Sequence, residues 1–181
     1  MVSLLAACGG EARPNLQPMQ FNIDPGQVGV PVEAGVLGVR FQPPAGWMPL
    51  SAADLDSINQ VLSGEALDLQ SQYVFSHPAN GSVLNVAAVG NAPTLGEQVA
   101  RYGTALAAKH PGAPIQQDEY LKDRIHIAQF LIQTKGYVTF TLFFVSSTER
   151  LLQFDYIVPQ ASYPGQIKAI ESSIGSIQLV E

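Results

Sequence analysis

The segment from residue 124 to residue 159 limits the possible folds more than any other, because it has the pattern of three consecutive β-strands. In its middle part, residues 137–145, large apolar residues occupy every second position, and the positions between them include Thr139 and Thr141. A period of two places the two sets on opposite faces of a sheet. One face is then wholly apolar and the other half apolar, so we expect this strand near the centre of the sheet. Its neighbours are expected at residues 125–134 and 151–158.

The connections between these strands support the same interpretation. Lys135-Gly136 is short and contains glycine, which is typical of a tight hairpin. Residues 146–150 form a longer polar connection. In the third strand, Gln153 and Asp155 are expected on the face opposite to the large apolar residues. Each large apolar side chain that is buried contributes about 1.5–3 kcal/mol, so this meander should supply much of the core.

Three amphipathic helices are expected around the sheet. Ser51 with Asp54, and Thr94 with Glu97, have the spacing of capping boxes, and each pair precedes apolar residues that recur at intervals of three and four. After residue 159, isoleucines at the same intervals predict a third helix. Further strands are expected at residues 19–23, 37–42, 73–77, 83–89, 115–121 and 176–180.

Composition excludes several classes of protein. The chain has 181 residues, of which 46% are hydrophobic and 13% charged, which predicts one folded domain rather than a disordered chain. The formal net charge is −6, and no cluster of Lys and Arg occurs. Binding to nucleic acid depends on neutralising phosphates, so a nucleic-acid partner is not expected. A membrane-spanning helix needs about 20 consecutive apolar residues, and no apolar run in the sequence approaches this length.

The N-terminus predicts where the protein is located. Residues 5–8, Leu-Ala-Ala-Cys, resemble the lipobox of bacterial lipoproteins, in which a peptidase cuts before the cysteine and the cysteine is then lipidated. The resemblance implies that residues 1–7 are a residual signal peptide and that Cys8, the only cysteine, carries the lipid. A working signal peptide is longer and has a basic region, so we expect a start codon placed too far downstream. The alternative is a chance run of small residues before a cysteine.

Residues 8–18 are interpreted as the lipidated cysteine and a flexible tether, and residues 19–181 as a single globular domain. The tether has two glycines, two prolines and no apolar period, and it gives a reach of about 15–20 Å. Several acyl chains, at about 0.8 kcal/mol for each buried methylene, anchor a protein firmly in a membrane. Glycine rather than aspartate follows Cys8, so the resemblance implies an outer-membrane location if the host has one.

The order of the expected elements resembles that of the PsbP-like superfamily, which includes DcrB-type bacterial lipoproteins. Two segments carry most of the resemblance: residues 41–47, Phe-Gln-Pro-Pro-Ala-Gly-Trp, and residues 170–174, Ile-Glu-Ser-Ser-Ile. The resemblance implies an α+β fold, an α/β/α sandwich with a central, mostly antiparallel sheet. It also implies a non-enzymatic role in binding or assembling proteins, with no shared catalytic residues to transfer.

The residues themselves show no catalytic or metal-binding motif. The spacings of His77, His110 and His126 match no metal-ligand pattern. No Gly-x-Ser-x-Gly segment occurs, so the nucleophile turn of many hydrolases is absent from the sequence. We therefore expect no enzyme, no metal and no cofactor. An envelope hydrolase without a recognisable motif stays open as a third hypothesis.

Recognition of a partner is the remaining class of function. Trp47, Tyr73, Tyr120 and Tyr137 lie near the ends of expected elements, and exposed aromatic residues favour interfaces. Packing in the core is the alternative for each of them. The first hypothesis is a cell-envelope lipoprotein that is held to the membrane at Cys8 and binds an envelope protein. The second is a small-ligand carrier with a pocket between the sheet and a helix.

Overall fold

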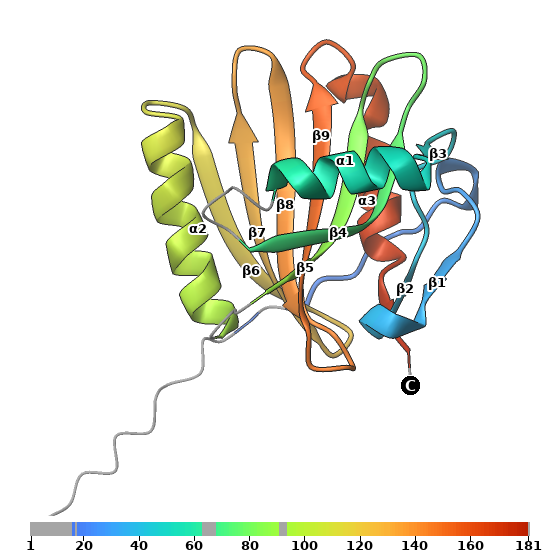
Figure 1. Cartoon of the computed structure of the whole chain (residues 1–181), viewed down its shortest axis with the longest axis horizontal. Coiled ribbons are helices and arrows are strands. Elements are labelled where there is room, and N and C mark those ends of the chain that lie inside the picture. Colours follow the sequence, from blue (N-terminus) through green and yellow to red (C-terminus); the bar gives the residue numbers. More distant parts are fainter. Residues whose placement is uncertain (1–15, 17, 63–67, 91–93, 181) are drawn as a thin grey trace, which may run out of the picture.

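The computed structural model describes residues 16, 18–62, 68–90 and 94–180 (Figure 1). The main sheet of this part of the chain has seven strands in the order β3-β4-β5-β9-β8-β7-β6, and every neighbouring pair is antiparallel. The strands are β3 (Met48–Pro49), β4 (Leu69–Ser76), β5 (Val83–Val89), β6 (Ile115–Lys122), β7 (Ile125–Gln133), β8 (Tyr137–Val145) and β9 (Leu151–Pro159).

The meander predicted at residues 124–159 is confirmed as β7, β8 and β9, and β8 and β9 lie in the middle of the sheet. β8 pairs with β9 along its whole length, from Tyr137 opposite Pro159 to Val145 opposite Leu151. The wholly apolar set of β8 is buried; in the other set Thr141 and Phe143 are buried, while Tyr137 and Val145, at the two ends of the strand, are exposed. Alternation along the sequence therefore predicted both the strand and its faces.

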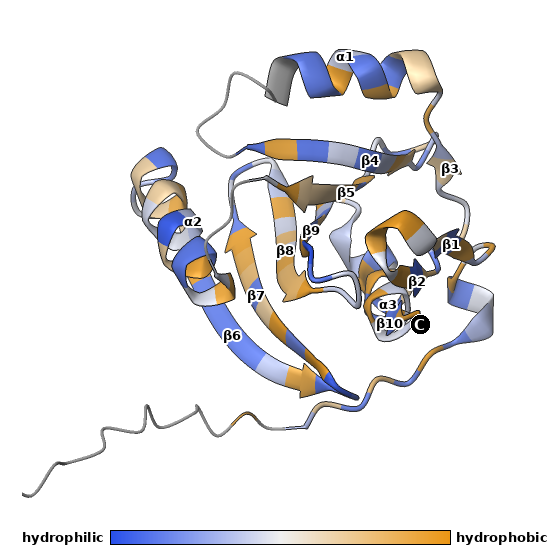
Figure 2. Ribbon diagram, turned by 60° about the horizontal axis from the view of Figure 1, so that its bottom comes forward, coloured by the Kyte–Doolittle hydropathy of each residue, from blue (hydrophilic) through white to orange (hydrophobic). Residues whose placement is uncertain are grey.

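One face of the sheet is covered by α3 (Tyr163–Gly175) and by a small second sheet of β1 (Val32–Ala34), β2 (Val39–Phe41) and β10 (Gln178–Leu179). The main sheet curves around these elements (Figure 2). A short 3-10 helix, η2 (Gly35–Leu37), connects β1 to β2, and another, η1 (Pro25–Gln27), precedes β1. The strands expected at residues 37–42 and 176–180 therefore form, but they pair with each other outside the main sheet, with Gln178 opposite Arg40.

The strand expected at residues 19–23 does not form. Pro18 makes one parallel bridge to Leu121 at the edge of β6, and the Met19 amide donates a hydrogen bond to the Leu121 carbonyl at 2.8 Å. The following residues pack against α3 instead, where Phe21 lies so close to Gly175 that a side chain at that glycine would collide with it. The apolar alternation of this segment reflects contact with a helix rather than pairing in a sheet.

The other face of the sheet is covered by α2 (Leu95–Lys109), which lies over β7 and β8. The predicted capping box is present: the Thr94 hydroxyl accepts a hydrogen bond from the Glu97 amide at 3.2 Å and donates one to the Glu97 carboxylate at 2.8 Å. A Cβ at Gly103 would lie 3.3 Å from the ring of Phe130. Glycine therefore lets the helix approach the sheet closely at this point.

α1 (Ala52–Leu62) lies beside β4, on the same side of the sheet as α2 (Figure 2). Its Asn59 acts as a strand partner, because the side-chain amide accepts from the Ser71 amide at 2.8 Å and donates to the Ser71 carbonyl at 3.0 Å. The edge of β4 is thereby protected at this residue, which disfavours pairing with another chain. Helices lie on both faces of an antiparallel sheet, so the expected α/β/α sandwich is confirmed.

Candidate functional site

Most of the aromatic residues that sequence reasoning singled out lie inside the protein. Trp47 is 5% exposed, and its indole N–H donates to the Gln166 side chain at 3.1 Å. Tyr120 is 3% exposed, and Tyr73 is half-buried against the same core. This burial favours core packing for all three. Cys8 lies outside the described residues, so its lipidation stays a prediction.

Tyr137 differs from the other three, because 51% of it is exposed. It begins β8 at the hairpin with β7, at the end of the sheet opposite to the point where Pro18 meets β6 (Figure 1). Its carbonyl accepts from the Thr134 amide at 2.9 Å, which fixes the hairpin. A hollow of about 710 Å³ lies beside this hairpin, with Lys109 and Lys135 among its lining residues. An exposed aromatic side chain favours a contact surface for another protein.

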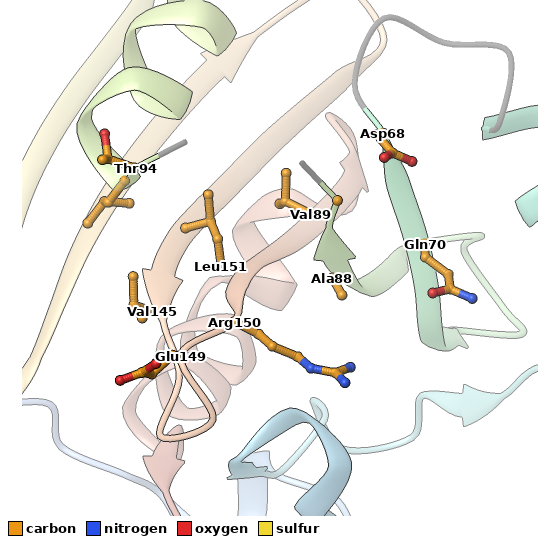
Figure 3. A pocket seen from close by; sticks show the side chains of 11 residues that line it. Asp68, Gln70, Ala88, Val89, Thr94, Val145, Glu149, Arg150 and Leu151 are labelled. Carbon is orange, nitrogen blue, oxygen red and sulfur yellow. The ribbon is translucent and has the colours of Figure 1, made fainter. Parts of the chain in front are cut away.

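A second pocket opens at the other end of the sheet, between the N-terminus of α2 and the loop that joins β8 to β9 (Figure 3). Its volume is about 530 Å³. Val89 and Leu151 supply apolar walls, while Asp68 and Arg150 reach toward the space from opposite sides. Gly90 lies so near the Asp68 carboxylate that a larger residue there would require the Asp68 side chain to move. Asp68, Glu149 and Arg150 are among its lining residues, so charges of both signs occur at the rim.

A third pocket, of about 740 Å³, lies between α3 and the sheet, and the N-terminal segment closes one of its sides. Phe21, Tyr120, Phe140 and Ile174 contribute apolar surface to it. The rings of Phe21 and Tyr120 lie 5.9 Å apart between centroids. The volume is within the range of about 300–1,000 Å³ that is common for small-molecule sites. Its walls come from segments far apart in the sequence, which is why the sequence alone did not locate it.

The face of the sheet toward α2 also holds a buried polar cluster around Asp155. The Asp155 carboxylate is 8% exposed and accepts the Thr141 hydroxyl at 2.7 Å and the Gln153 amide at 2.8 and 3.0 Å. The Tyr102 hydroxyl, from α2, lies 2.9 Å from the Thr141 hydroxyl. Asn85 is a more distant donor at 3.5 Å. The sequence had placed Gln153 and Asp155 on this face but did not predict their burial.

Several atoms in and near this cluster have no hydrogen-bond partner among the described residues. They include the Asn85 and Gln153 side-chain oxygens and the side-chain nitrogen of Gln98, which is 1% exposed. Gln98 lies one helical turn before Tyr102, on the side of α2 that faces the sheet. Buried polar atoms are normally satisfied. A glutamine within the apolar stripe of a helix was a sign in the sequence that could have indicated this cluster.

Burial raises the pKa of Asp155 above its ordinary value of 3.8, although hydrogen bonds from Thr141, Gln153 and Asn85 oppose the shift. Burial likewise raises the pKa of the Tyr102 phenol. No ion pair to Asp155 occurs among the described residues, so no cation offsets the loss of hydration. A carboxyl group in such a place tends to keep its proton.

The pKa of Asp155 predicts a pH dependence of stability. The native state keeps the proton to higher pH than the unfolded chain, so the stability that this group contributes is present below about pH 4 and is lost as pH rises through the native pKa. Relative to Asp155→Asn, which does not titrate, the wild-type free energy of unfolding should fall by up to about 1.4 kcal/mol per pH unit in that window.

Urea unfolding of both proteins, repeated across a pH series that starts near the unfolded-state pKa, measures this difference. Asp56→Asn, on the exposed side of α1, is the matched control and should give a curve parallel to that of the wild type. If the wild type and Asp155→Asn also gave parallel curves, the carboxyl group at position 155 would not have the raised pKa described above.

The described residues hold no group of three or more His, Cys, Asp or Glu side chains placed to bind a metal ion. His126 pairs with the Glu119 carboxylate at 2.9 Å on the surface. His77 accepts a hydrogen bond at Nδ1 from the Ala79 amide at 3.2 Å. Among the helices that the structure describes, none has the length and apolar character that crossing a bilayer requires.

Comparison with known proteins gives a structural relative but no sequence relative. No protein-family model matches the chain, and no curated protein matches its sequence. The structure is similar to the solution structure of cyanobacterial PsbP (CyanoP) from Synechocystis sp. PCC 6803, with a TM-score of 0.54 and 11% sequence identity over 97% of this chain and 98% of that chain. At this identity the similarity concerns the fold, and it agrees with the layers and sheet order described above. The chain therefore has a PsbP-like fold.

Proposed function

We propose that this chain is a lipid-anchored protein of the bacterial cell envelope, of the DcrB type, whose folded domain binds a protein partner and catalyses no reaction. The observation that carries the proposal is the lipobox-like segment that ends at Cys8, eight residues before Leu16, where the described residues begin. The PsbP-like fold supports it, because the superfamily that the sequence resembles includes lipoproteins of this layout. The domain would then face the periplasm or the outside, and the anchor would lie in the outer membrane where the host has one.

The end of the sheet that carries Tyr137 is the surface that we assign to the partner. Pro18 meets the opposite end of the sheet, so a tether that leads from there to a membrane would leave the β7–β8 hairpin, which carries Tyr137, at the end of the sheet away from the bilayer (Figure 1). Tyr137 is exposed, and Lys109 and Lys135 lie nearby without an ion pair among the described residues. Aromatic and basic side chains together favour a partner with acidic groups around an apolar centre.

The absence of catalysis is supported by what surrounds the titratable groups. The described hydrogen bonds of His77 and His126 go to a backbone amide and to a glutamate, not to a serine that could be activated. The carboxyl group with the clearest pKa shift, Asp155, is held by hydroxyl and amide donors inside the protein. Among the described hydrogen bonds, the one hydroxyl that these groups hold, that of Thr141 on Asp155, is buried with its residue only 1% exposed, whereas covalent catalysis requires a nucleophile that a substrate can reach.

Site-specific photocrosslinking in living cells tests this function. A photoreactive amino acid at position 137 should yield a discrete crosslinked product with another envelope protein, because this position lies in the proposed contact surface. The matched control is position 56, which is exposed on α1. Lys135→Glu should reduce the product at position 137 several-fold, since it reverses a charge of the surface. Equal products at positions 137 and 56, or none at 137, would contradict the assignment.

The pocket between α3 and the sheet favours a second function, that of a small-ligand carrier. At about 740 Å³, with Phe21, Phe140 and Ile174 in its walls, it has the size and apolar surface of a ligand site. It also lies between the sheet and a helix, where the sequence analysis expected such a pocket. The two functions are compatible, because Tyr137 and this pocket are at different places on the domain.

A further inference from the structure

The pocket between α3 and the sheet has a charge pattern that distinguishes among ligands. We propose that it binds an organic cation with an apolar body, such as an alkylammonium group, and this proposal rests on the carrier function above. The pattern comes from Asp118 and Glu171, whose carboxylates belong to opposite walls of the pocket: Asp118 lies on β6, and Glu171 lies on α3.

In the part of the chain that the structure describes, no cationic side chain neutralises these carboxylates. No Lys, Arg or His is among the described residues that line the pocket. The described ion pairs include neither Asp118 nor Glu171. Asp118 accepts the Gln116 side-chain amide at 2.6 Å, and this neutral donor leaves the charge in place. Glu119, which also lines the pocket, pairs with His126 at 2.9 Å and is therefore less available.

The apolar part of the pocket is also suited to a cation. Three of its lining residues are aromatic: Phe21, Tyr120 and Phe140. The faces of aromatic rings attract ammonium groups, and this is how quaternary ammonium ligands are commonly recognised. Met19 and Ile174 offer additional apolar surface for the body of the ligand. Aromatic walls with two unneutralised carboxylates therefore favour a cation over a neutral or anionic molecule of the same shape.

Charge should determine affinity when the apolar part of the ligand is kept constant. The probes are decyltrimethylammonium, 1-decanol and decanoate, which share one alkyl chain length, and each is titrated below its micelle concentration into the purified full chain by calorimetry. We expect the ammonium compound to bind with a Kd at least about ten-fold lower than that of 1-decanol, and decanoate to bind most weakly. High salt should reduce the difference, since it screens the carboxylates.

Two variants locate the effect in this pocket. Asp118→Asn combined with Glu171→Gln should reduce the affinity for decyltrimethylammonium to about that for 1-decanol and leave 1-decanol binding unchanged, because only the charge is removed. Asp56→Asn, which removes an exposed carboxylate from α1, should leave all three affinities unchanged. A circular dichroism melt of each variant confirms that it is folded.

The outcomes separate this inference from the carrier function. Equal affinity for the ammonium compound and 1-decanol would overturn the preference for a cation while leaving a carrier of neutral ligands. Binding of none of the three probes would overturn both. An ammonium group can belong to a free amine or to a lipid head group, so a second titration uses phosphatidylcholine vesicles with and without phosphatidylethanolamine. Binding of the free probe without any vesicle binding assigns the site to soluble amines. Vesicle binding that is lost when both Asp118 and Glu171 are replaced assigns it to lipids.

Discussion

Phe154→Ala is expected to lower the free energy of unfolding by about 3–5 kcal/mol, because it removes a large side chain from the middle of the core. Phe154 lies on β9, the central strand of the main sheet, and has no exposed surface. Its ring packs against Phe41 of the small sheet at 5.2 Å between centroids and against Phe144 of β8 at 5.3 Å. The side chain therefore joins the two sheets, and the cavity left by alanine could not be filled by a single neighbour.

Urea unfolding followed by circular dichroism measures this loss as a lower midpoint with an unchanged slope. Domains of this size have a stability of about 5–15 kcal/mol, so Phe154→Leu, which removes less volume, is included in case the alanine variant does not fold. Tyr137→Ala is the matched control: Tyr137 is exposed and should change stability by no more than about 0.5 kcal/mol. A Phe154→Ala protein as stable as this control would contradict the packing described for the meander.

Local patterns in the sequence predicted those parts of the fold that depend on neighbouring residues. The alternation in residues 137–145 predicted β8 and its two faces, because period and burial are linked within a strand. The capping box of Thr94 and Glu97 predicted the start of α2. The strand expected at residues 73–77 begins earlier than predicted, because residues 69–72 also belong to β4, where the register shifts between Ser71 and Tyr73. An extra residue at such a bulge interrupts the alternation on which sequence-based prediction depends.

Features that depend on distant segments were not predictable in this way. Alternation in residues 19–23 predicted a strand, but none of the described strands pairs with it, and Phe21 packs against α3 instead. The aromatic residues Trp47 and Tyr120 lie at the ends of elements, yet the layers above them bury both. The pocket that Asp118 and Glu171 line has walls from β6, from α3 and from the N-terminal segment, which are far apart in the sequence. Each of these results depends on tertiary contacts that no local pattern records.

The proposed anchor at Cys8 predicts an all-or-none change in location. Several acyl chains contribute about 0.8 kcal/mol for each buried methylene, so a lipidated protein stays on the membrane and a protein without them does not. Leu16 lies eight positions after Cys8, and a flexible tether of this length would span about 15 Å. The domain would therefore be held near the bilayer, with the pocket beside the N-terminal segment on the membrane side.

The most direct test of a lipid-anchored module is the mass and location of the protein made from its own gene, with the sequence upstream of residue 1 in place. The wild-type protein should be found in the membrane fraction and be released by detergent but not by salt, and its intact mass should correspond to a chain that starts at Cys8 and carries acyl groups. Cys8→Ala should be absent from the membrane fraction. An unmodified Cys8 thiol in the wild-type protein, or the same fractionation for both proteins, would contradict the account.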